Sequence, residues 1–109
     1  MAVRLTKKWI SAEQALAELR GNLGVFELAN GADEVVYIGF AGGTSLYGLK
    51  GVVAEALQTV ANASQVRYEV TNAYHTRYRE LLMAYQADFG ALPPANPPLP
   101  FKLGKLSPA

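Results

Sequence analysis

The chain has 109 residues, of which 50% are hydrophobic and 17% charged, so it is long enough for one domain with a hydrophobic core. A net charge of +1 excludes a strong overall attraction to nucleic acid or to membranes, and the absence of cysteine excludes disulfides and cysteine-ligated zinc. No apolar run resembles a signal peptide or a membrane span, so we expect a cytoplasmic protein without membrane partners.

The first 23 residues are expected to form an N-terminal extension with one short helix. Ser11 and Gln14 have the spacing of a capping box, in which each side chain bonds a main-chain amide of the first turn. Apolar residues then share one helix face, and Gly21 and Gly24 end the helix.

A β-hairpin is predicted next, from strands over residues 24–28 and 35–40. Both segments are rich in β-branched and aromatic residues. Asn30-Gly31 lies between them, and these two residues tolerate the positive φ angles of a tight turn.

The second half of the chain predicts a helix over about 49–61, a strand over 66–70 and a helix over about 74–89. Asn72 is the expected N-cap of the last helix and Gly90 its end. The tail, residues 93–109, is rich in proline and is expected to be extended, with Leu99, Phe101 and Leu103 as anchors on the domain surface.

The glycine-rich segment 42–51 does not match a phosphate-binding loop. Gly43 and Gly48 have the spacing of a P-loop, but Leu49 stands where the lysine must be, and the dinucleotide-binding pattern G-x-G-x-x-G does not occur. The segment is therefore predicted to be a bend before a helix.

The single histidine, His75, lies beside Arg79 on a helical wheel and away from the aromatic stripe. The chain has neither an H-x-x-x-H pair nor a G-x-S-x-G elbow, so a surface position is preferred to a catalytic one. Arginines and tyrosines alternate over residues 66–80. They predict either nucleic-acid binding or, more simply, a tyrosine-lined core face with arginines in solvent.

The two strands of the hairpin resemble the motifs of the GIY-YIG family of nuclease domains. Gly24-Val25-Phe26 stands in place of Gly-Ile-Tyr, and Tyr37-Ile38-Gly39 is the second motif intact. Glu80 and Asn96 then follow in the order of the family's glutamate and asparagine. The resemblance covers residues 24–96 and implies one α+β domain over 1–109, with a three-stranded antiparallel sheet flanked by helices in the order α-β-β-α-β-α-tail.

The resemblance also implies metal-dependent hydrolysis of nucleic-acid phosphodiesters. Glu80 would hold Mg²⁺ or Mn²⁺, Tyr37 would line the site and help to activate water, and Asn96 would support it. Two family side chains are missing. Phe26 replaces the first tyrosine, and the segment "SLYGLKG" offers Lys50 in place of the family arginine. His75 is a further candidate for the site.

Each of these residues also has a structural explanation. Tyr37 could pack the sheet, Lys50 could be a solvated cation, and Glu80 could pair with Arg77. Asn96 could be a turn residue between prolines. Two hypotheses follow, a nuclease of weak or undetectable activity and a GIY-YIG-like module without catalysis that binds nucleic acid or a protein.

Overall fold

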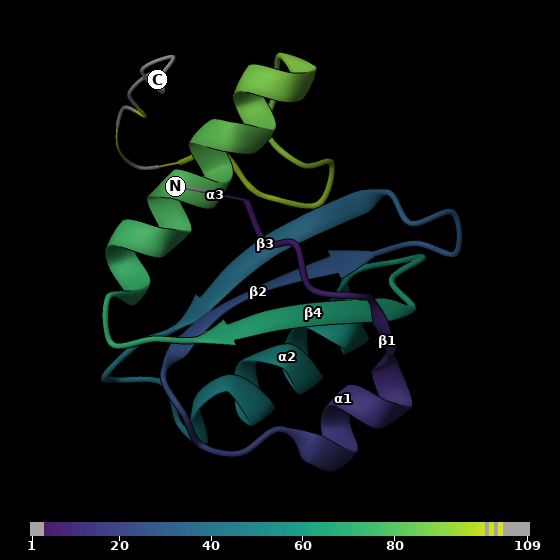
Figure 1. The fold of residues 1–109 in the computed structure, drawn as a ribbon, viewed down its shortest axis with the longest axis vertical. Coiled ribbons are helices and arrows are strands. Elements are labelled where there is room, and N and C mark those ends of the chain that lie inside the picture. Colours follow the sequence, from purple (N-terminus) through teal and green to yellow (C-terminus); the bar gives the residue numbers. More distant parts are fainter. Residues whose placement is uncertain (1–3, 100, 102, 104–109) are drawn as a thin grey trace.

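The computed structural model describes residues 4–99, 101 and 103, which form a four-stranded antiparallel sheet and three helices (Figure 1). The elements in chain order are β1 (Ile10–Ser11), α1 (Ala12–Glu18), β2 (Gly24–Ala29), β3 (Val35–Ala41), α2 (Gly48–Thr59), β4 (Gln65–Val70) and α3 (Tyr74–Phe89). The α+β class, the hairpin of β2 and β3, and the helices after it are confirmed.

The three predicted strands, β2, β3 and β4, pair in one antiparallel sheet, and a fourth strand extends it in the order β1-β4-β2-β3. The fourth strand is β1, in which Ile10 pairs with Val66 and Ser11 with Gln65. Two residues are too few to show the alternation that predicts a strand from sequence. Residues 10–18 therefore belong to the folded domain, because β1 extends the sheet and α1 packs beside it.

Helices cover both faces of the sheet, α1 and α2 on one face and α3 on the other (Figure 1). Phe26 and Leu28 point toward α2, whereas Val25 points toward α3. All six residues of β2 are buried as a result, since this central strand has a helix layer on each side.

The helix ends agree with the sequence at Ser11 and Gly90 but differ at Asn72 and at the end of α1, whose C-cap is Leu19 and not a glycine. Ser11 Oγ accepts a hydrogen bond from Gln14 N at 3.1 Å, and Gly90 ends α3 with φ +77°. Asn72 does not cap α3. Instead, Thr71 Oγ1 accepts from Ala73 N at 3.1 Å, because the helix begins one residue later than the asparagine needs. Within the described part of the chain, no helix is both long and apolar enough to cross a membrane.

The described part of the tail lies against the domain. Ala95 N donates to Val36 O at 2.9 Å, and Leu99 and Leu103 pack on the apolar cluster between the sheet and α3. The Arg79 guanidinium lies over the Phe101 ring, 4.2 Å from its centroid. The three predicted anchors therefore contact the domain, while residues 100, 102 and 104–109 lie outside the described structure.

Candidate functional site

The two motif tripeptides face each other across β2 and β3. Phe26 pairs with Gly39 and Glu27 with Ile38. A Cβ atom on Gly39 would lie 2.5 Å from Phe26 Cζ and 2.9 Å from Tyr37 Cε2. The glycine of the second motif therefore makes room for the ring pair of Phe26 and Tyr37, whose centroids are 5.9 Å apart.

Gly24, the first glycine of the motifs, allows β2 and β4 to approach closely. A Cβ atom on this residue would lie 2.1 Å from the main-chain oxygen of Glu69 on β4. No side chain fits there without moving the strands apart, so this glycine has a structural role that needs no catalysis.

Tyr37 lines a small cavity of about 180 Å³ between β3 and α2, with Phe26, Phe40 and Glu55 among its neighbours. Burial, and then the charge of Glu55, raise the pKa of the Tyr37 phenol above its usual range. A raised pKa keeps the phenol protonated at neutral pH. In this environment Tyr37 is suited to donate a hydrogen bond, and not to act as a base.

Lys50 lies on the exposed side of the first turn of α2. Its side chain is not among those that line the Tyr37 cavity, and it forms no ion pair with any described residue. Its main-chain N–H bonds Arg20 O at 3.1 Å. The arrangement is that of a solvated cation at a helix start.

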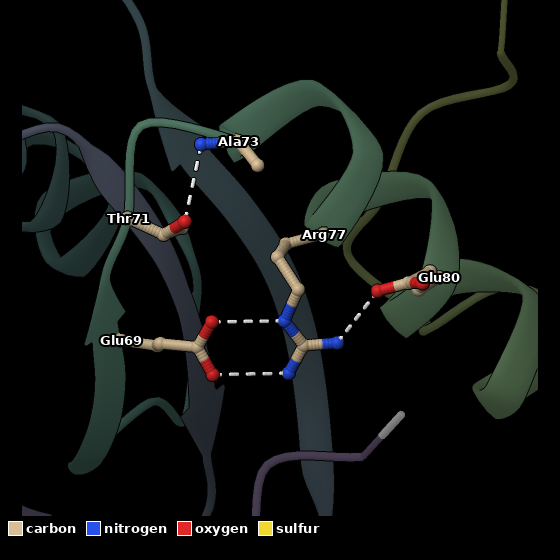
Figure 2. A network of polar contacts seen from close by, with 5 residues as sticks. All are labelled: Glu69, Thr71, Ala73, Arg77 and Glu80. Atoms are coloured by element: carbon tan, nitrogen blue, oxygen red, sulfur yellow. Dashed lines mark hydrogen bonds and ion pairs between the residues drawn. The ribbon is translucent and has the colours of Figure 1, made fainter. Parts of the chain in front are cut away.

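Glu80 belongs to a polar network that joins α3 to β4 (Figure 2). Arg77 donates from Nε and Nη2 to the two carboxylate oxygens of Glu69, at 2.9 and 3.1 Å. Its Nη1 donates to Glu80 Oε1 at 3.0 Å. The hydrogen bonds from Arg77 hold the pKa of Glu69 below its usual range.

This network does not suit the metal that the resemblance implies. A guanidinium already lies 3.0 Å from Glu80 Oε1, and a divalent cation there would be repelled by it. Within residues 4–99, 101 and 103, no three histidine, aspartate or glutamate side chains are grouped so that they could hold a metal ion. The structure contains the ion pair of Glu80 with Arg77, which was the structural explanation offered for Glu80 from the sequence.

His75 is exposed at the start of α3 and contacts two aromatic rings. Its ring centroid lies 5.2 Å from that of Phe40 and 4.7 Å from that of Tyr74. Tyr74 Oη accepts a hydrogen bond from Gly43 N at 3.3 Å, which ties the glycine-rich loop to α3. His75 therefore belongs to a surface aromatic cluster near the free edge of β3.

Asn96 contacts the second motif directly, although 58 residues separate it from Ile38. Its Nδ2 donates to Ile38 O and its Oδ1 accepts from Ile38 N, both at 2.9 Å. The side-chain amide thus bonds the edge strand β3 as a neighbouring strand would. Asn96 fastens the tail to the centre of the motif Tyr37-Ile38-Gly39.

The predicted catalytic residues do not come together. Tyr37 packs on the α2 side of the sheet, and Glu80 lies on α3, which covers the other side. Adjacent residues of a strand point to opposite faces, so Ile38 faces α3 and Tyr37 does not. The structure joins the two motifs and Asn96, but it places Tyr37 and Glu80 on opposite sides of the sheet, and Lys50 does not line the Tyr37 cavity.

A larger cavity of about 510 Å³ lies on the α3 side of the sheet, beside residues 4–6 and the second half of α3. Glu27, one of four acidic residues that line it, has a side chain that is only 7% exposed. Arg67 Nε donates to Glu27 Oε1 at 2.6 Å, and the Trp9 ring packs on that guanidinium at 4.1 Å. Burial raises the pKa of Glu27 above its usual range, although Arg67 opposes the shift.

Sequence reasoning did not single out Glu27. The signal was present, because a glutamate stands between two apolar residues of a strand, "GVFELA", that is otherwise apolar on both faces. A charge at such a position must be paired or must reach a cavity, since burying it alone is costly.

The fold and the paired tripeptides define a small α+β domain in which an antiparallel sheet, with the hairpin of β2 and β3 at one end, lies between helix layers. Residues 3–88 match a family model described as Domain of unknown function (DUF7508). The match covers most of the chain, so the protein belongs to this family. No curated protein and no solved structure matches the chain significantly.

Proposed function

We propose that the protein is a catalytically inactive module of GIY-YIG-like fold that binds a partner protein. The observation that carries this proposal is the separation of Tyr37 and Glu80 on opposite faces of the sheet. Hydrolysis of a phosphodiester needs a base, a metal and a cation in one place.

Three further features support an inactive module. Phe26 has no hydroxyl, and the exposed Lys50 is not among the residues that line the Tyr37 cavity. Glu80 is occupied by the guanidinium of Arg77. The loss of one strong transition-state donor costs about 10²–10³ in rate, so several losses together leave little activity.

A protein partner is favoured over nucleic acid because the net charge is only +1 and three of the ten basic residues are neutralised within the fold. Arg4, Arg67 and Arg77 each form an ion pair with a carboxylate. A surface for nucleic acid needs a row of unpaired cations that replace the counterions of several phosphates.

The partner would contact a surface formed by Leu46, Tyr47 and Val70, which we call the Leu46 surface. These side chains are 75%, 73% and 54% exposed. The two chain segments that carry them both bond to residues 20–24: Leu49 N bonds Asn22 O at 2.9 Å, and Thr71 N bonds Leu23 O at 3.0 Å. Large apolar side chains exposed together are typical of protein interaction surfaces.

The first experiment measures cleavage of supercoiled plasmid and single-stranded DNA with Mg²⁺ and with Mn²⁺. We expect no cleavage above that of Glu80→Ala, and no saturable binding of DNA or RNA at physiological salt. Multiple-turnover cleavage that disappears in Glu80→Ala would restore the nuclease hypothesis. Tight nucleic-acid binding without cleavage would identify a nucleic-acid module instead.

The second experiment places a photo-crosslinking residue at position 47 and, as a control, at position 89. Phe89 is a matched control because it is 68% exposed and lies at the far end of α3. We expect a specific crosslinked protein from position 47 only. Once that protein is purified, Tyr47→Ser should weaken its binding about tenfold or more, while Phe89→Ser should not.

A further inference from the structure

The cavity beside Glu27, here called the Glu27 cavity, has the size of a small-molecule site. Its volume is about 510 Å³, and known ligand pockets range from about 300 to 1,000 Å³. It combines an apolar wall with a few polar groups, which is the usual composition of such pockets. The wall includes Leu5, Val35, Leu81 and Ala84.

Only one oxygen of the buried Glu27 carboxylate is occupied. Oε1 accepts from Arg67, whereas Oε2 accepts no hydrogen bond from any described residue. Among the described residues, no fully buried side-chain nitrogen or oxygen lacks a partner. Oε2 is therefore not fully buried, and because Glu27 lines the cavity, we infer that this oxygen faces it.

The charges around the cavity favour a cation. Its lining contains four carboxylates, from Glu27, Asp33, Glu34 and Asp88, and two guanidiniums, from Arg4 and Arg67. Each guanidinium is paired with one of these carboxylates, at 2.7 Å for Arg4 and Asp88 and 2.6 Å for Arg67 and Glu27. The lining therefore has a formal charge of −2, and an anionic ligand would be repelled.

We propose that the Glu27 cavity binds a small organic cation, a protonated amine with an apolar tail. The ammonium group donates to Glu27 Oε2, and the tail packs against Leu81 and Ala84 of α3. A buried carboxylate is a strong anchor for such a group, because hydrogen bonds between ions are shorter and stronger than neutral ones. This inference is independent of the Leu46 surface, which shares no residue with the lining of the cavity.

The test uses three probes with the same tail: hexylammonium, hexanol and hexanoate. Each is titrated into the ¹⁵N-labelled protein while amide shifts are followed by NMR. We expect hexylammonium to shift the amides of Val35, Leu81 and Ala84 and to bind about tenfold or more tightly than hexanol, with no binding of hexanoate. Equal affinity for the three probes, or no shifts around the cavity, would overturn the proposal.

Two variants test whether the carboxylate of Glu27 is the group that binds the ammonium. Glu27→Gln keeps the shape of the side chain and should reduce hexylammonium binding to the level of hexanol. Glu55→Gln is the matched control, since Glu55 is an exposed glutamate on α2, on the other side of the sheet, and should bind as the wild type does. Unchanged binding in a folded Glu27→Gln protein would contradict the proposal.

A measurement on the wild type decides the matter if Glu27→Gln does not fold. The ¹³C shift of the Glu27 carboxyl is followed against pH with and without each probe. Arg67 and Arg77 already act on this carboxyl, and Asp33, Glu34, Asp88 and Arg4 line the same cavity. A bound ammonium should lower the pKa of Glu27, because a nearby cation favours the carboxylate, and hexanol should not. The same pKa with and without hexylammonium would refute the site.

Discussion

At the scale of single residues, the ring of Phe26 explains why a glycine stands at position 39. Replacing it with alanine places a methyl group 2.5 Å from Phe26 Cζ, in a core that cannot expand freely. We expect Gly39→Ala to destabilise the fold by about 1–3 kcal/mol in urea unfolding. Gly31→Ala is the control, because nothing lies within 4 Å of a Cβ atom there. The loss in free energy of unfolding caused by Gly39→Ala should be smaller in a protein that also carries Phe26→Leu. Equal stability of the two glycine variants would show that the ring moves aside freely.

At the scale of elements, the side-chain amide of Asn96 joins the tail to β3. Asn96→Ala leaves the N–H and C=O of Ile38 without these partners, and we expect a loss of about 1–3 kcal/mol. Hydrogen exchange at the Ile38 amide should become faster than at the Glu69 amide in the sheet interior. Asn72→Ala is the matched control, since this asparagine makes no capping hydrogen bond and its loss should leave stability unchanged. Unaltered protection of Ile38 would mean that the tail does not hold the strand.

At the scale of the whole molecule, the network between β4 and α3 makes stability depend on pH. The pKa of Glu69 is lowered by Arg77, so its contribution is present above the ordinary value of 4.5 and is lost as the pH falls through the folded pKa. We expect Arg77→Gln to cost about 1 kcal/mol more at pH 7 than at pH 3, since the pair is partly exposed. Urea unfolding of both proteins over this range measures the difference. A difference independent of pH would assign the effect of Arg77 to packing.

Much of the fold could be predicted because its signals are local. The Asn30-Gly31 signal and the β-branched segments around it indicate the hairpin, although the positive φ of its loop lies at Asp33. The apolar spacing after Leu49 indicates α2. The motifs singled out Asn96 as well, because their order along the chain places it after Glu80. The two-residue strand β1 could not be predicted in this way, since its pairing with β4 is not local.

By itself, the sequence determined every element except β1, the paired tripeptides and the identity of the side chains that a nuclease site would need. Only the tertiary structure decided where those side chains point. The helices that pack on each face of the sheet decide which side chains meet. Tyr37 therefore lies on the α2 side of the sheet and Glu80 on the α3 side. Packing likewise placed Glu27 in the lining of a cavity, because burial and charge pairing arise from residues distant along the chain, such as Arg67 and Leu81.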